Sequence, residues 1–247
     1  IPARAGVYEP IPAFLPAELG DLLHKKGIDK LYSHQAASLA AVESGQDIVV
    51  VTPTASGKTL CYNLPVIKAL LEDEAARALY LFPTKALAQD QVAELMVWSD
   101  QLGGEIKTYT YDGDTPGDAR IAIRSAGSIV VTNPDMLHSG ILPHHTKWLR
   151  LFENLKYVVI DELHTYRGVF GSHVANVLRR LQRICRFYGA NPQFICTSAT
   201  IANPGEHGAA LLGRPVTVIA ENGAPSGRKE IVFYNPPVVN KPLGIRR

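Results

Sequence analysis

The sequence has few cysteines, little net charge and no long apolar run, and each of these absences excludes a class of protein. Its three cysteines, Cys61, Cys185 and Cys196, form no CxxC pair and no cluster with histidine, which excludes a disulfide framework and a zinc site of the usual spacing. Lysine and arginine number 25 against 23 for aspartate and glutamate, so a net charge of +2 excludes a uniformly basic DNA-packing protein but not a local basic surface.

Targeting and membrane signals are also missing from the sequence. No stretch approaches the roughly 18 apolar residues that span a bilayer. The chain starts at Ile1, without a methionine and without the pattern of a signal peptide. We therefore expect a cytoplasmic domain, cut from a longer protein and without a membrane partner.

Short runs of apolar, often β-branched residues alternate with helical stretches along most of the chain. These apolar runs do not alternate with polar residues, and predicted helices separate one run from the next. Both features are typical of a parallel sheet with helices on both faces. The sequence therefore predicts an α/β fold. The predicted strands cover residues 47–51, 79–82, 128–132, 157–160 and 194–197, with weaker candidates at 106–110 and 216–219, and the predicted helices between them cover 58–71, 84–99, 116–124 and 169–188.

The length of 247 residues fits one large domain with a segment on each side. Residues 1–30 are predicted to be a lead-in that carries one short helix at 16–26. Residues 31–220 are predicted to form the domain. Glycine, proline and charge accumulate afterwards, so residues 221–247 are predicted to be a linker with one strand at 230–234.

Residues 52–59, TPTASGKT, follow a predicted strand and open a predicted helix, which is the setting of a phosphate-binding loop. Backbone N–H groups around Ser56 and Gly57 would then face the phosphates. Lys58 would place its charge on the β- and γ-phosphates, and Thr59 would offer a hydroxyl to Mg²⁺. The general pattern, GxxxxGK followed by Ser or Thr, has glycine where this chain has Thr52, so an ordinary strand-to-helix turn is the alternative.

Two adjacent carboxylates, Asp161 and Glu162, follow another predicted strand. Ligands of open α/β sheets bind at the carboxyl ends of the strands, so the pair is placed to act on a bound nucleotide. Asp161 is predicted to hold Mg²⁺ through its water shell, and Glu162 to orient and deprotonate the attacking water. The alternative is an acidic helix start that suits the helix dipole. Beside Lys58 and Thr59, the pair favours an ATP hydrolase.

Five short segments occur in the order of motifs I, Ia, Ib, II and III of the superfamily-two helicases. They are TASGKT at 54–59, PTKALAQDQ at 83–91, TNPD at 132–135, DELH at 161–164 and SAT at 198–200. The chain therefore resembles the first RecA-like domain, a P-loop domain, of a DEAD/DEAH-box (DExH) helicase. Within that superfamily, the segments LYSHQ at 31–35, YDGDTP at 111–116 and TNPDML at 132–137 most resemble the mitomycin repair factor A (YprA-type) DNA helicases, bacterial relatives of the fungal RecQ-four-like helicases.

The resemblance implies a motor that hydrolyses ATP to translocate along single-stranded DNA, in DNA repair. It implies that Gln35 recognises adenine and that His164 couples ATP chemistry to Ser198 and Thr200, whose hydroxyls can exchange partners when the site closes. The residues implied to bind the nucleotide through the loop are Thr54, Ala55, Ser56, Gly57, Lys58 and Thr59.

The resemblance also places nucleic acid beside two other predicted strands. Thr84 and Lys85 in one loop, and Thr132 and Asn133 in another, are expected to contact the nucleic-acid backbone, as hydroxyls and cations do. Asp112, Gly113, Asp114 and Thr115 are expected to form a structural turn. Arg120 and Arg124 are expected to contact either phosphate or the carboxylates of Asp114 and Asp118.

A second RecA-like domain of the same parent chain is the other implied partner, since it would supply the arginine fingers that act on ATP. No motif of that half is visible after residue 220, and the four-cysteine cluster of the subfamily is absent. The chain is therefore expected to be half of a motor, with little ATP hydrolysis of its own. An RNA helicase domain and a nucleotide-gated binding module without catalysis are the alternatives; a kinase would have little use for Glu162 as a base.

Overall fold

The structure is a computed structural model that describes residues 1–235, 238–240 and 245–246. The predicted linker at 221–247 is therefore described in part, because residues 236–237, 241–244 and 247 lie outside the described ranges. In the part that is described, no helix is long and apolar enough to cross a membrane.

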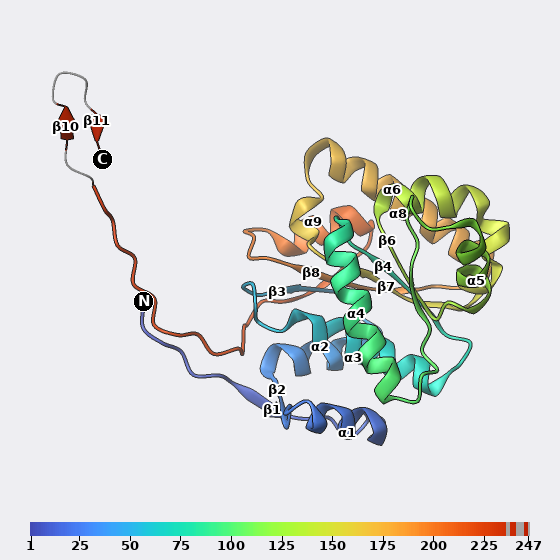
Figure 1. The fold of residues 1–247 in the computed structure, drawn as a ribbon, viewed down its shortest axis with the longest axis horizontal. Coiled ribbons are helices and arrows are strands. Elements are labelled where there is room, and N and C mark those ends of the chain that lie inside the picture. The colour runs from blue at the N-terminus through green and yellow to red at the C-terminus, as the bar shows by residue number, and fades with distance from the viewer. Residues whose placement is uncertain (236–237, 241–244, 247) are drawn as a thin grey trace.

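A seven-stranded sheet forms the centre of the chain, with the strand order β5-β6-β4-β7-β8-β3-β9 (Figure 1). Every neighbouring pair in it is parallel, so all the strands end at the same edge. The prediction of a parallel α/β sheet is confirmed. The strands are β3 (Ile48–Val51), β4 (Arg77–Leu81), β5 (Thr108–Thr110), β6 (Ile129–Thr132), β7 (Leu155–Ile160), β8 (Gln193–Ser198) and β9 (Thr217–Ile219).

Helices cover both faces of this sheet, because successive side chains of a strand point to opposite sides. On β4, Ala78 and Tyr80 pack into one hydrophobic core, and Leu79 and Leu81 pack into the other. Burying one such Leu or Val side chain contributes about 1.5–3 kcal/mol. The first layer holds α1 (Ala17–Lys25), α2 (Ser33–Glu43), α3 (Lys58–Glu72) and α4 (Lys85–Gln101), and the second holds α5 (Gly117–Ala126), α7 (Leu149–Asn154), α8 (Gly168–Phe187) and α9 (Pro204–Leu212).

Several short helices and the nine-residue helix α9 were not predicted from the sequence. After β6 the chain runs through α6 (Pro134–Met136), a π-helix η1 (Leu137–Ile141) and a 3₁₀-helix η2 (Leu142–Trp148), and after β7 through the 3₁₀-helix η3 (Leu163–Thr165). Helix α9 begins with Pro204 and ends at Leu212, and Gly213 directly after it has a left-handed φ of 71°. Proline at the first position and glycine after the last are ordinary helix boundaries, so these two residues were the missed signal.

The N-terminal segment and the segment around Ser226 run side by side, and the chain then continues past the N-terminus toward β10 (Figure 1). Strand β1 (Tyr8–Pro10) pairs with β2 (Lys30–Tyr32), and Arg4 forms an isolated antiparallel bridge with Ser226. The predicted strand at 230–234 is wrong: these residues have no regular structure, and residues 231–234 are exposed. An isolated strand has no partner for its backbone groups, so apolar β-branched residues alone do not form one. The two remaining strands, β10 (Val238–Asn240) and β11 (Ile245–Arg246), pair with each other.

Candidate nucleotide and nucleic-acid site

The predicted phosphate loop connects β3 to α3, as the sequence pattern requires. Its backbone is left-handed at Ala55, with φ 61°, and at Gly57, with φ 79°. The positive φ of Gly57 favours glycine, and a Cβ there would lie 2.6 Å from Nε2 of Gln35, so a larger residue would also displace that amide. The hydroxyl of Thr52 is buried and lies 2.6 Å from Oγ of Ser56, so the residue that departs from the glycine pattern braces the loop from inside.

The side chain of Lys58 folds back over this loop. Its Nζ donates to the carbonyl oxygens of Thr52, at 2.9 Å, and of Pro53, at 3.0 Å. Burial lowers the pKa of Lys58, and the negative charges of Glu162 and Asp161 oppose that shift. The ammonium group therefore lies near both carboxylates, and its hydrogen-bond partners are neutral carbonyl oxygens. An anionic phosphate is a stronger partner for an ammonium group and can replace these carbonyls.

Asp161 and Glu162 directly follow β7, and hydrogen bonds hold the Asp161 carboxylate in place. Asp161 Oδ1 accepts hydrogen bonds from the hydroxyl of Thr197 and from the backbone N–H of Glu162, the latter at 2.8 Å. Glu162 is left-handed, with φ 53°, a conformation that costs a residue with a side chain on the order of 1–3 kcal/mol. Such strain is common at functional sites, which agrees with the place of Glu162 in the predicted site.

His164 lies between the acidic motif and the SAT segment. Its Nδ1 is 3.2 Å from the Glu162 carboxylate and 3.3 Å from the backbone nitrogen of Ala199, which donates to it. The ion pair needs a proton on Nδ1, whereas the bond from Ala199 needs a bare nitrogen, so the two contacts exclude each other. Ser198 is buried and its hydroxyl has no partner among the described residues, whereas Thr200 is exposed. The positions suit the predicted coupling role, which stays a prediction.

Gln35, the predicted adenine reader, is buried beside the phosphate loop. Its Oε1 accepts from the backbone N–H of Tyr32, and its Nε2 donates to the carbonyl of Gly57, each at 2.9 Å. Both ends of the amide are therefore paired within the chain, and adenine recognition would have to share or replace these bonds. The same contacts connect the start of α2 to the loop.

The four residues predicted to contact nucleic acid lie at the carboxyl ends of β4 and β6, and each bonds to another part of the chain. Thr84 caps α4 by accepting from Leu87 N at 3.4 Å, and Asn133 caps α6 by accepting from Met136 N at 2.8 Å. Lys85 is exposed and pairs with Asp114. Thr132 is buried and donates to the carbonyl of Tyr111 at 2.6 Å, so its predicted contact with nucleic acid would have to come from its backbone.

Comparisons with known proteins agree with this geometry. The sequence profile of the DEAD/DEAH box helicase family matches residues 32–207, which is more than half of the chain. The chain belongs to the DEAD/DEAH box helicase family.

This helicase domain is similar to parts of longer proteins. It is 64% identical over 247 residues to the uncharacterized ATP-dependent helicase YprA of Bacillus subtilis and spans 33% of that protein. It is 42% identical over 245 residues to the ATP-dependent helicase HRQ1 of Saccharomyces cerevisiae, covering 97% of this chain and 22% of the other. A crystal structure of the DUF1998 helicase MrfA bound to DNA and AMPPNP matches all of the chain with a TM-score of 0.97 and 64% identity, over 34% of its own length. The predicted resemblance and the RecA-like architecture are confirmed.

Arg120 of the helicase domain does not pair with Asp114 or Asp118, and its predicted contact with phosphate stays a prediction. Its guanidinium donates to the carbonyl oxygens of Thr115, at 2.9 Å, and of Asp112, at 3.2 Å, and lies over the ring of Tyr111. The carboxylate of Asp114 is instead paired with Lys85. The turn at 112–115 is thus the structural turn that its glycine and aspartates indicate, and Arg120 holds it in place.

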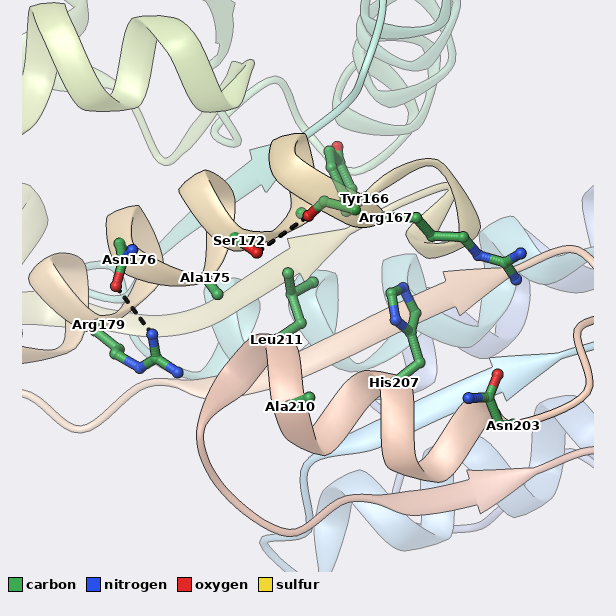
Figure 2. Close-up of a pocket in the computed structure, with 12 residues that line it drawn as sticks. Tyr166, Arg167, Ser172, Ala175, Asn176, Arg179, Asn203, His207, Ala210 and Leu211 are labelled. Carbon is green, nitrogen blue, oxygen red and sulfur yellow. Dashed lines mark hydrogen bonds between the residues drawn. The ribbon is translucent and has the colours of Figure 1, made fainter.

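A cavity of about 490 Å³ lies between α8 and α9 of the helicase domain, and none of the predicted site residues lines it (Figure 2). His207 of α9 and Asn203 directly before it line one side, and Asn176 and Arg179 of α8 line the other (Figure 2). His207 Nε2 donates to the carbonyl of Leu163 at 3.1 Å, so α9 fastens the short helix that follows Glu162.

Thr197, Thr52 and His207 are site residues that sequence reasoning missed. The paired register sets Ile160 opposite Cys196, so Thr197 lies opposite Asp161. Thr197 could be placed beside Asp161 only by knowing that β7 and β8 are neighbours, and the sequence alone does not give the order of strands in the sheet. Thr52 was noticed only as a departure from the glycine pattern.

Proposed function

We propose that this chain is the ATP-binding motor domain of an ATP-dependent DNA helicase that acts in DNA repair. The observation that carries the proposal is the meeting of Lys58, Asp161 and Glu162 at the carboxyl edge of one parallel sheet, where the charges act on each other. The similar MrfA structure is bound to DNA and AMPPNP, which supports a nucleotide as the ligand and DNA as the polymer. The repair role rests on the resemblance to the mitomycin repair factor A helicases.

The residues at the carboxyl edge of the sheet would have different roles in ATP binding and hydrolysis. Lys58 would leave the carbonyls of Thr52 and Pro53 and hold the β- and γ-phosphates. Thr59 and Asp161 would hold Mg²⁺, since a hydroxyl, a carboxylate and phosphate oxygens are the hard ligands it prefers. The ion would supply positive charge against the phosphates. Glu162 would accept the proton of the attacking water.

Single-stranded DNA would lie across the ends of β4 and β6, near Lys85 and Asn133. A phosphate there would compete with Asp114 for the Lys85 ammonium. Translocation also needs a second RecA-like domain that opens and closes against this one, which agrees with the fact that the chain spans 33% of YprA and 34% of the MrfA chain. Residues 1–30 would then be a lead-in and residues 221–247 a linker toward that domain.

Nucleotide binding by the Lys58→Ala variant tests the proposal. Titration calorimetry with Mg²⁺ and AMPPNP should show a site in the native chain and none in the variant, because the variant has lost the ammonium that replaces water around the phosphates. Lys25→Ala on α1, which removes an exposed lysine far from the loop, should bind like the native chain. Equal binding by Lys58→Ala and the native chain would disprove the site.

A further inference from the structure

His34 is a buried, titratable group to which the ATP chemistry assigns no role. It lies on α2 directly before Gln35, and its side chain is 1% exposed. Its Nδ1 accepts a hydrogen bond from the backbone N–H of Gly223 at 3.2 Å. Its Nε2 has no hydrogen bond of good geometry among the described residues, although the ring lies near the backbone of Ser56 in the phosphate loop.

These contacts fix the form of the imidazole. A nitrogen that accepts from an N–H carries no proton, so neutral His34 carries its proton on Nε2. Burial lowers the pKa of His34, the backbone of Ser56 opposes that shift, and the charge of Lys58 adds to it. The neutral ring therefore presents an N–H that is buried and poorly satisfied, an arrangement that costs about 1–3 kcal/mol until an acceptor reaches it.

Gly223, on the other side of the ring, belongs to a segment that is tightly fitted to α2. A Cβ at Gly223 would lie 2.7 Å from Ser33 N and 2.8 Å from Val7 O, so only glycine fits without a shift. Val7 N donates to the carbonyl of Gly223 at 2.8 Å, and Ser33 N donates to the carbonyl of Val7 at 2.9 Å. We call residues 222–226 the exit segment, because Figure 1 shows the C-terminal part of the chain leaving the domain here beside the N-terminus.

We propose that His34 is a positioning residue that couples the phosphate loop to the exit segment. The inference rests on the proposed nucleotide site. When Lys58 moves from the loop carbonyls to a phosphate, the loop at 52–57 is free to close on the Nε2–H of His34. An imidazole that donates at Nε2 is a better acceptor at Nδ1, because hydrogen bonds in a chain polarise one another. Nucleotide binding thereby strengthens the hydrogen bond that Gly223 N–H donates to Nδ1 of His34.

Hydrogen–deuterium exchange of the exit segment, with and without saturating Mg²⁺ and AMPPNP, measures this coupling in the 247-residue chain. In the native chain, the nucleotide should slow exchange at Gly223 about fivefold or more, the low end of measured couplings between two sites. His24→Gln on α1, an exposed histidine paired with Asp29, is the matched control and should keep this response.

Two replacements of His34 separate coupling from simple packing. In His34→Asn the amide oxygen takes about the place of Nδ1, so Gly223 should stay protected without nucleotide, but the response to nucleotide should disappear. In His34→Gln the amide takes about the place of Nε2, so Gly223 should exchange fast in both states. Gly223→Ala leaves His34 in place and should also give fast exchange in both states while the chain still binds AMPPNP.

The outcomes that contradict the inference differ from those that contradict the nucleotide site. Unchanged exchange at Gly223 in a native chain that binds AMPPNP by calorimetry would overturn the coupling alone. Slower exchange at Gly223 on nucleotide binding in His34→Asn would also overturn the coupling. The asparagine side chain is too short to contact both Gly223 and the phosphate loop. Failure of the native chain to bind AMPPNP at all would overturn the proposed function and the coupling with it.

Discussion

The carboxyl edge of the sheet has two halves that are built differently. At the ends of β3, β7 and β8, the site side chains bond to one another: Asp161 with Thr197, and Glu162 with His164. At the ends of β4 and β6, three of the four predicted contacts, Thr84, Thr132 and Asn133, bond to backbone atoms. The fourth, Lys85, is exposed and pairs with Asp114. We refer to the two halves as the nucleotide half and the nucleic-acid half.

The difference between the halves reflects what each must do. Chemistry on ATP needs carboxylates and a lysine held at fixed angles, and partial burial makes their charges act strongly on each other. Binding a polymer backbone needs only donors and cations that a phosphate can reach, and helix N-termini provide these at the surface. A residue of the nucleic-acid half can therefore have a structural role in the free protein and a binding role in the complex.

The largest expected effect concerns the domain as a whole. A full-length helicase that contains this domain and a second RecA-like domain should hydrolyse ATP about 10³–10⁵ times faster than the 247-residue chain when single-stranded DNA is present. The reason is that an arginine finger from a second domain stabilises the charge that develops on the phosphates. A phosphate-release assay on both proteins measures the ratio. If the two rates were equal, the nucleotide half would be complete in itself and the half-motor hypothesis would be wrong.

Glu162→Gln separates binding from chemistry within the nucleotide half. The amide keeps the shape of the side chain but accepts no proton, so ATP turnover should fall by about 10²–10⁴ while AMPPNP affinity stays close to native. Phosphate release and calorimetry on the same full-length helicase give the two quantities. Glu153→Gln, at an exposed position of α7, should leave both unchanged. Lost binding together with normal turnover would contradict the role of a base.

Thr197→Val tests whether the bonds between site residues matter. The replacement has nearly the same shape and removes only the hydroxyl that donates to Asp161 Oδ1. Outer partners of metal ligands are commonly worth 10–100-fold, so we expect ATP turnover to fall by about that factor and the Mg²⁺ concentration for half-maximal turnover to rise. Full native activity at low Mg²⁺ would show that Asp161 is oriented without this bond.

The two smallest expected effects lie in the nucleic-acid half. Lys85→Ala should weaken binding of single-stranded DNA and lower the slope of log K against log salt by about 0.7, the value for one lost phosphate contact on a single strand. Fluorescence anisotropy at several salt concentrations measures the slope. Lys107→Ala is the matched control, since this exposed lysine lies just before β5, at the opposite edge of the sheet. Equal slopes for the two variants would remove Lys85 from the interface.

The exposed pair of Lys85 and Asp114 sharpens the same comparison. Asp114→Asn removes the carboxylate that competes with phosphate, so DNA affinity should rise slightly, by less than that lost in Lys85→Ala. The same anisotropy titration detects the sign. Weaker binding by Asp114→Asn would mean that the turn at 112–115 needs the charge for its shape.

Sequence reasoning predicted the nucleotide half better than its surroundings. Lys58, Asp161 and Glu162 follow buried strands, and few other residue types can do their chemistry, so the pattern showed both their place and their proposed roles. The short helices between β6 and β7 were missed, since their turns are irregular and carry no steady period. The strand predicted at 230–234 failed because its formation depended on a neighbouring strand, which no local pattern reveals.

The alternation of strands and helices, the loop at 52–59 and the acidic strand end could be predicted from the sequence, because periodicity and short-range spacing are properties of the chain alone. The pairing of β8 with β7, which brings Thr197 to Asp161, and the return of the exit segment to α2, which brings Gly223 to His34, arise only in the folded domain. Contacts between residues 36 or 189 positions apart depend on how buried faces pack together. Packing is a property of the whole fold, and no segment of the sequence specifies it alone.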